Sequence, residues 1–360
     1  MNRYSGENQS QKNDGMLHSD PTCDWKDLCF QIRTDLLLES AELDVSVQES
    51  AGLNGEGAHD VKLELPVREY EKNGLEITDI RIETDKQAKR LDRKKGRYIT
   101  IYSDGLKEDD GGIHQEAVNE VADLLRQLLP QNVKTVFVAG LGNPNASPDA
   151  LGPDTISHVA VNRHLNQHLN QHMNQHQHTD QAVRKSDIQV CAMAPGVMAQ
   201  TGLETAGILS GVTEIFHPDA IVVVDALAAR SVTRLGTTIQ LTDTGISPGS
   251  GVGNHRQEIS QSVLGIPVIA IGIPMVVEAA AIIYETIDAI RNILEQEKTD
   301  REPGFLNQLS KQEQYHLFRE LLEKKSRPLY VTVKDIDEME KRLSFTLSEA
   351  INQALIGMNS

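Results

Sequence analysis

The sequence contains few cysteines and few aromatic residues. Its 360 residues include only three cysteines, Cys23, Cys29 and Cys191, and aromatic residues make up 4% of the chain. Three cysteines without a repeated spacing form no common zinc-binding pattern, and an odd, low count is typical of a reducing compartment. Aliphatic side chains must therefore fill the core, which favours a parallel sheet covered by helices.

The chain also lacks excess positive charge and an uninterrupted apolar segment. Its formal net charge is −17, so bulk electrostatics argue against direct binding to nucleic acid or to an anionic membrane, but not against a basic or neutral peptide. The polar N-terminus has no apolar core, so we expect no signal peptide. Residues 266–283 contain Pro267, Pro274 and Glu278, which favour a strand, a turn and a buried helix over a membrane span. We expect a cytoplasmic protein.

Apolar runs alternate with helical patterns through the middle of the chain. This alternation predicts a doubly wound, mostly parallel α/β domain over residues 115–295. We expect an N-terminal extension with a small β element at 36–114 and a C-terminal helical segment at 296–360. The strands expected in the main sheet are Val133–Ala139, Ile188–Ala192, Ala220–Val224, Thr238–Leu241 and Val268–Ile271.

Local signals add detail to this organisation. Glu76–Ile82 and Arg97–Tyr102 alternate apolar and polar residues, which predicts a pair of strands. Thr201 with Glu204 has the spacing of a capping box and predicts a helix through about Gly211. Longer helices are expected over Glu116–Leu129, Met275–Ile293 and Lys334–Ile356.

Two aspartates follow apolar strands. Val133–Ala139 leads through a Gly/Asn/Pro turn to Asp149, and Ala220–Val224 leads directly to Asp225. Because open α/β sheets present chemistry at the carboxyl ends of their strands, we expect both to share one crevice. Two close carboxylates do not both ionise easily, so one keeps a proton while the other accepts a proton from water, as in aspartic peptidases. The alternative for each aspartate is a structural role as a helix cap.

A histidine-rich repeat interrupts the α/β pattern at residues 163–180. Its four-residue period places His164, His168, His172 and His176 on one helical face. Imidazoles at this spacing are able to chelate a metal ion. No carboxylate accompanies them, however, and low-complexity repeats often lengthen surface loops. We therefore favour an insertion without a metal.

Seven sequence blocks, taken in their order along the chain, closely resemble the germination protease family of spore-forming bacteria. RTDLLLE at 33–39 and the helical C-terminus look similar as well, so that the resemblance covers roughly residues 30–355. The blocks are GLGN at 140–143, PDALGP at 148–153, APGVM at 194–198, TGLET at 201–205, DALAARS at 225–231, TTIQLTDTGISPGSGVGN at 237–254 and LGIPVIAIGIP at 264–274.

The resemblance implies an endopeptidase that degrades small acid-soluble spore proteins during germination. It further implies a self-processing zymogen, a homotetramer, and an aspartic-type mechanism that uses no metal or other cofactor. The family's two essential aspartates match Asp149 and Asp225. The fold resembles that of hydrogenase-maturation endopeptidases, which use nickel for recognition, so the alternative function is a metal-dependent maturation-type endopeptidase.

The propeptide is expected to comprise residues 1–35 and to be largely disordered. The family's substrates are cut between an acidic and an apolar residue, and Asp35–Leu36 is such a pair behind a polar leader. We therefore predict cleavage between Asp35 and Leu36. The alternative is that this segment is only an ordered docking strand.

Other polar residues are weaker candidates for substrate binding. Asn143 and Asn145 either orient the scissile carbonyl or satisfy a tight turn, and His255 and Arg256 either bind an acidic substrate side chain or belong to a solvated loop. Ser247 occupies a position where the family often has histidine, which puts a role for a third side chain there in doubt. The glycines of this loop indicate close approach of its backbone to substrate or to another loop; they are Gly249, Gly251 and Gly253.

Overall fold

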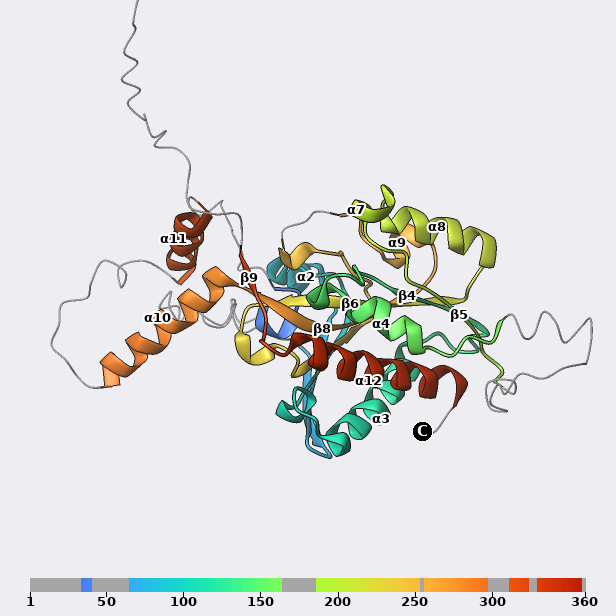
Figure 1. The fold of residues 1–360 in the computed structure, drawn as a ribbon, viewed down its shortest axis with the longest axis horizontal. Coiled ribbons are helices and arrows are strands. Elements are labelled where there is room, and N and C mark those ends of the chain that lie inside the picture. Colours follow the sequence, from blue (N-terminus) through green and yellow to red (C-terminus); the bar gives the residue numbers. More distant parts are fainter. Residues whose placement is uncertain are drawn as a thin grey trace, which may run out of the picture. The chain divides into compact units, whose positions relative to one another are not determined.

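The architecture is described by a computed structural model for residues 34–40, 65–163, 186–252, 256–296, 311–323 and 329–357 (Figure 1). These residues belong to one compact unit. Most of the predicted propeptide, residues 1–33, lies outside the described residues, as do the histidine repeat from His164 onward and His255. What the sequence indicates for these residues stays a prediction.

Nine strands in the described part of the chain form a single sheet. They are β1 (Val67–Lys72), β2 (Leu75–Ile82), β3 (Gly96–Tyr102), β4 (Thr135–Gly140), β5 (Gln189–Met193), β6 (Ala220–Ala229), β7 (Thr238–Thr242), β8 (Val268–Glu278) and β9 (Tyr330–Val331).

The described helices lie between and after these strands. The α-helices are α2 (Asp85–Leu91), α3 (Gly111–Leu128), α4 (Leu151–His158), α7 (Met198–Thr201), α8 (Thr205–Phe216), α9 (Gln261–Leu264), α10 (Ala279–Gln296), α11 (Lys311–Glu323) and α12 (Ile336–Ile356). Short 3₁₀ helices occur at η2 (Asp104–Leu106), η3 (Ser147–Asp149), η4 (Val232–Arg234) and η5 (Ser250–Val252).

The sheet has a parallel half and an antiparallel half. Its strand order is β1-β2-β3-β7-β8-β6-β4-β5, and β9 pairs with β8. β5, β4, β6 and β8 pair in parallel, whereas β1, β2, β3 and β7 pair antiparallel. The predicted α/β class is confirmed, as is the predicted strand pair, which is β2 with β3. Because β3 also pairs with β7, the small N-terminal β element continues the main sheet.

Helices cover both faces of the sheet (Figure 1). On β4, Val136 and Val138 join the core cluster that includes residues of α3 and α12. Phe137 and Ala139 point to the opposite face and join a cluster with residues of α8. A strand that is buried on both faces has no polar side to show, which is why β4 reads as a continuous apolar run.

The helices predicted over Glu116–Leu129 and Lys334–Ile356 are confirmed as α3 and α12. α3 begins slightly before the predicted start because the Asp110 carboxylate accepts hydrogen bonds from the N–H groups of Gly112 and Ile113. α12 buries Leu343, Leu347 and other apolar residues against α3 and the sheet. Each such side chain contributes about 1.5–3 kcal/mol on removal from water, so packing holds these helices in place.

β6 and β8 are longer than predicted, and this changes the surroundings of Asp225. β6 was expected to end at Val224, and a helix was expected from Met275, but the two strands stay paired to Ala229 and Val277. Asp225 therefore lies inside a strand. The small residues after Asp225 are compatible with a helix, but pairing with a neighbouring strand overrides that weak preference. Pro274 sits beside the irregularity in this pairing, where a missing N–H is tolerated.

Two further predictions are settled by the helices. The capping box at Thr201 and Glu204 was wrong: Glu204 is itself the N-cap of α8, and its side chain makes no capping hydrogen bond. The apolar stretch 266–283 contains the whole of β8 and the start of α10. None of the helices in the described ranges is long and apolar enough to cross a membrane.

Candidate active site

The loop after β4 brings Asp149 back onto its own first residues. Gly142 has a φ of 115°, and a Cβ atom there would lie 1.9 Å from the carbonyl oxygen of Asp149, so only glycine fits. The Asn143 N–H donates to the Asp149 side chain at 2.8 Å. A turn fixed at both ends holds the Asp149 carboxylate at the carboxyl edge of the parallel strands, as the sequence predicts.

Asp225 comes from the centre of the sheet. Its side chain shares the strand face of Ile221 and Val223, which is the face covered by α8. Asp225 is 6% exposed, and its carboxylate accepts a hydrogen bond of 2.9 Å from the N–H of Ala226. Burial raises the pKa of Asp225 well above the ordinary range of aspartate, because desolvation disfavours the charged form.

The two aspartates interact electrostatically in the structure. After burial, the next cause of the raised pKa of Asp225 is the charge of Asp149, followed by the charge of Asp35. The pKa of Asp149 is raised less strongly, by burial alone, and the Asn143 N–H and the Arg256 charge oppose the rise. The result is an asymmetric pair in which Asp225 retains its proton more readily than Asp149.

The other predicted polar residues fall into two groups. Arg256 lies near both aspartates, and its charge lowers the pKa of each. Asn143 organises the loop: its side-chain oxygen accepts hydrogen bonds from the Gln200 side chain at 2.6 Å and from the Asn145 N–H at 3.0 Å. Asn145 is exposed. The geometry thus uses Asn143 as a turn residue and leaves a role in substrate binding for either asparagine untested.

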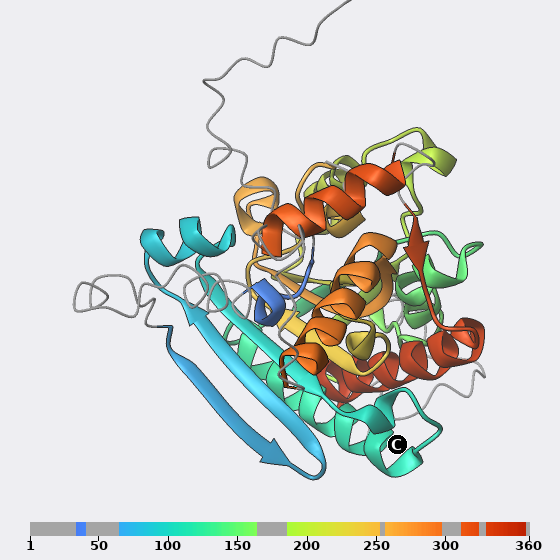
Figure 2. The ribbon, with the colours of Figure 1, turned by 90° about the vertical axis from the view of Figure 1, so that its left-hand side faces the viewer.

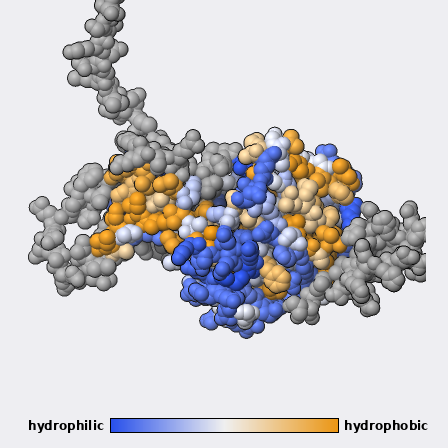
Figure 3. Space-filling view, viewed as in Figure 1, coloured by the Kyte–Doolittle hydropathy of each residue, from blue (hydrophilic) through white to orange (hydrophobic). Residues whose placement is uncertain are grey.

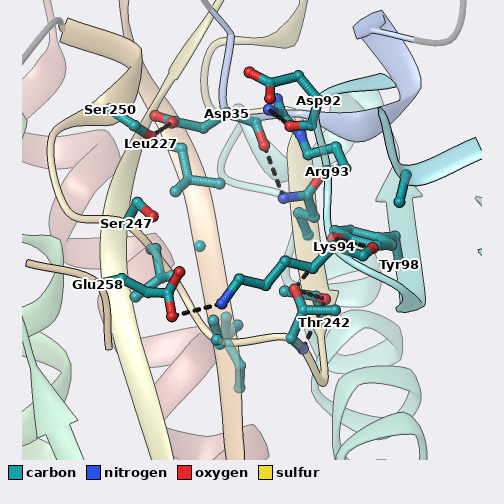
Figure 4. Close-up of a pocket in the computed structure, with 18 of the residues that line it drawn as sticks. Asp35, Asp92, Arg93, Lys94, Tyr98, Leu227, Thr242, Ser247, Ser250 and Glu258 are labelled. Atoms are coloured by element: carbon teal, nitrogen blue, oxygen red, sulfur yellow. Dashed lines mark hydrogen bonds and ion pairs between the residues drawn. The ribbon is translucent and has the colours of Figure 1, made fainter. Parts of the chain in front are cut away.

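A cleft of about 1020 Å³ opens on the same sheet face (Figure 4). Asp225 pairs with Gly272 of β8, and Gly272 pairs on its other side with Gln240 of β7. Directly paired residues share a face, so the side chains of Asp225 and Gln240 point the same way. Leu227 extends over Gly272 and lines the cleft. Neither aspartate lines the cleft, but Asp225 lies in the same row as Gly272 and Gln240, which do.

Residues 34–40 lie in this region, between α10 and the antiparallel strands (Figure 2). The Asp35 N–H donates to the carbonyl oxygen of Ala228 at 2.9 Å. The Gln240 side-chain amide donates to the Asp35 carbonyl oxygen at 3.1 Å and accepts from the Leu37 N–H at 2.9 Å. Gln240 therefore spans the peptide bond that the sequence predicts to be cut.

The side chains around that bond are held as firmly as its backbone. Leu36 is fully buried in an apolar cluster with Leu227, Tyr284 and Tyr315. The Glu39 carboxylate accepts hydrogen bonds from the N–H groups of Arg230 at 2.7 Å and Ser231 at 2.9 Å. Residues 34–40 are thus ordered, and they contact Ala228 within β6 and Arg230 and Ser231 just after it.

Sequence reasoning missed Gln240 as a site residue. It stands in a strand of alternating pattern, where a buried glutamine is indistinguishable from a structural one, and only its register with Asp225 reveals its place. The predicted close approach of the glycine loop is confirmed at Gly251, where a Cβ atom would lie 2.4 Å from the Asp35 carboxylate. In the parts of the chain that the structure describes, no three His, Cys, Asp or Glu residues are grouped to hold a metal ion.

Comparison with known proteins gives consistent results for the sequence. A family model described as germination protease matches residues 38–303. The germination protease of Caldanaerobacter subterraneus subsp. tengcongensis is 39% identical, over 90% of this chain and 94% of the relative. Those of Oceanobacillus iheyensis and Clostridium perfringens are 35% and 36% identical, each over 91% of this chain and 94% and 95% of the relative.

A solved structure was also matched. The [NiFe] hydrogenase maturation protease HycI from Thermococcus kodakarensis is 16% identical and aligns over 64% of this chain and 99% of its own, with a TM-score of 0.30. The sequence comparisons have the coverage and identity that establish membership. The chain therefore belongs to the germination protease family and is an endopeptidase.

Proposed function

We propose that the protein degrades small acid-soluble spore proteins during germination, with Asp149 and Asp225 as the catalytic pair. The observation that carries the proposal is the burial of Asp225 beside the charge of Asp149. Such a site keeps one carboxyl protonated while the other ionises. Family membership and the endopeptidase activity support the choice of substrate.

The difference in pKa between Asp149 and Asp225 indicates which is the base and which is the acid. Asp149, with the smaller rise in pKa and a stabilising N–H from Asn143, is the base. It takes a proton from a water molecule, whose oxygen forms a bond to the scissile carbonyl carbon. Asp225, protonated at the start, supports the carbonyl oxygen and supplies the proton that the leaving nitrogen needs when the C–N bond breaks. One water is consumed, and a carboxyl group and an amine are released.

The same site is proposed to process its own chain between Asp35 and Leu36. This peptide bond lies in an ordered segment bound against β6 and β7 by Ala228 and Gln240. The charge of Asp35 also acts on Asp225, so the two carboxylates are close. A zymogen with this arrangement holds a substrate-like sequence beside its active site until cleavage releases the propeptide.

The proposal includes a homotetramer in the cytoplasm of the developing and dormant spore, with no cofactor. Apolar side chains on and just before α8 support association between copies: Leu203 is 60% exposed, Ile215 74% and Phe216 37%. Figure 3 shows further hydrophobic residues over α10. A surface of this kind is typical of an interface. Sedimentation of the purified chain measures the assembly directly.

The decisive experiment incubates the protein with a small acid-soluble spore protein, with and without a chelator, and maps the cuts by mass spectrometry. We expect cleavage after acidic residues that is insensitive to the chelator and absent in Asp225→Asn. Loss of activity on chelation, with recovery on addition of a metal, would assign the chain to metal-dependent cleavage instead. Full activity of Asp225→Asn would remove the aspartate pair from the mechanism.

A further inference from the structure

The carboxylate of Asp35 is enclosed by hydrogen-bond donors. Its Oδ1 accepts from the hydroxyl group of Ser250 at 2.7 Å and from the N–H of Gly251 at 3.0 Å. Its Oδ2 accepts from the N–H of Ala228 at 2.8 Å. These donors come from η5 and from the part of β6 beyond Asp225, and they converge on a side chain 193 to 216 positions away in the sequence. We call this group of donors, Ala228, Ser250 and Gly251, the acid cradle.

The chemistry of the acid cradle favours a carboxylate. A carboxylate is acceptor-only, so each of its oxygens is able to accept from the donors that face it. An asparagine in the same place would turn its NH₂ group toward a donor and lose at least one of these bonds. Charge-assisted hydrogen bonds are also about twice as strong as neutral ones, which widens the difference.

The shape of the acid cradle is equally restrictive. A Cβ atom at Gly251 would lie 2.4 Å from the Asp35 carboxylate and 2.7 Å from the Cβ of Ala228. A side chain at position 251 would therefore fill the space that the carboxylate occupies. Glycine leaves the N–H accessible there, which explains why the backbone approaches so closely.

The position of the acid cradle relative to the predicted cut is fixed by the backbone. The Gln240 amide and the carbonyl oxygen of Ala228 hold residues 35 and 37 in register. Leu36 is then buried on the other side of the Asp35–Leu36 bond. An acidic side chain in the acid cradle and an apolar one in the adjoining cluster thus flank one peptide bond.

We propose that the acid cradle is the specificity subsite for an acidic residue on the N-terminal side of the scissile bond, and that Asp35 occupies it in the uncleaved chain. This inference rests on the proposed function. Cleavage after Asp35 removes this occupant with the propeptide and opens the subsite to acidic residues of protein substrates. Ser250 is the specificity-determining side chain, since the other two donors are backbone groups.

The test follows cleavage of the Asp35–Leu36 bond in the full-length chain by intact mass and N-terminal sequencing. We expect Asp35→Asn and Ser250→Ala each to slow cleavage by about tenfold or more, and Asp35→Glu to retain more activity than Asp35→Asn. Ser262→Ala is the matched control, because it removes a serine hydroxyl that contacts Glu258 instead of Asp35.

A double-mutant cycle separates recognition from general damage. If Ser250 acts through the Asp35 carboxylate, Ser250→Ala has little further effect in the Asp35→Asn chain. Multiplicative effects of the two changes, or wild-type cleavage of Asp35→Asn, would overturn the inference. Thermal unfolding of each variant checks its folding, and the Asp35 variants give an answer even if Ser250→Ala is unstable.

Failure of the inference is distinguishable from failure of the proposed function. A chain that hydrolyses a small acid-soluble spore protein after non-acidic and acidic residues alike, or that does so without cutting Asp35–Leu36, retains the function and contradicts the acid cradle. A chain that hydrolyses no such protein, whatever the state of its N-terminus, contradicts the function itself.

Discussion

Two of the carboxylate pairs in the described part of the chain lie in very different surroundings. Asp149 and Asp225 lie at the carboxyl edge of the parallel strands, next to an open cleft and a bound peptide segment. Glu340 of α12 lies against Asp154 of α4, where the two helices pack. Burial and the Asp154 charge raise the pKa of Glu340 to about 8.

The comparison teaches that a raised pKa does not by itself mark an active site. Desolvation is the main cause of the raised pKa of both Asp225 and Glu340, and in both cases a neighbouring carboxylate raises it further. Only Asp225 shares a row with a peptide-binding amide, Gln240, across the glycine of β8. We therefore interpret the helix pair as structural and the sheet pair as catalytic, and each prediction below tests that division.

The largest expected effect is on activity. Asp225→Asn and Asp149→Asn are expected to lower the rate of protein hydrolysis about a thousandfold or more, because each removes one half of the acid–base pair. Glu340→Gln is the matched change at the other pair and is expected to retain near-normal hydrolysis. Rates are measured on a small acid-soluble spore protein. Equal losses at both pairs would erase the distinction between them.

A smaller loss is expected at Gln240. Gln240→Met has similar length but loses both the donor to the Asp35 carbonyl and the acceptor for the Leu37 N–H, so self-processing is expected to slow about tenfold to a hundredfold. Gln257→Met, the same change at an exposed position, is the control. The rate of appearance of the Leu36 N-terminus is the measurement, and an unchanged rate would show that the amide only supports the strand.

The Glu340–Asp154 pair is expected to affect the stability of the folded protein. The folded state holds the Glu340 proton up to about pH 8, whereas the unfolded chain releases it near its ordinary value of 4.5. Stability from this group is therefore lost as pH rises between these values. Glu340→Gln, which cannot ionise, is expected to be about 4 kcal/mol more stable than the wild type at pH 8.5 and nearly equal at pH 4.5. Denaturant unfolding at both pH values tests this, and an equal difference at both would contradict it.

The smallest expected effect is on the pH profile. The proposed mechanism requires Asp149 ionised and Asp225 protonated, so the rate should rise with pH through the pKa of Asp149 and fall through that of Asp225. The Arg256 charge lowers both pKa values. Arg256→Gln is therefore expected to move both limbs of the bell-shaped profile to higher pH. Movement of one limb alone, measured as kcat/KM against pH, would show that Arg256 acts on one aspartate only.

The fold was largely predictable because its signals are local. The apolar runs that form β4, β5 and β7, and the periodic pattern of α3 and α12, each appear where they were expected. Errors arose where packing overrode a weak local preference. The four residues after Asp225 read as a possible helix start, yet they form hydrogen bonds to β8 and remain a strand.

By itself, the sequence determined the order of strands and helices, the glycine turn that holds Asp149, the two aspartates and the family of the chain. Tertiary structure alone decided which residues meet: the row of Asp225, Gly272 and Gln240, and the donors around the Asp35 carboxylate. The physical reason is that these contacts depend on sheet order and strand register, which join residues far apart in the chain and leave no trace in local periodicity.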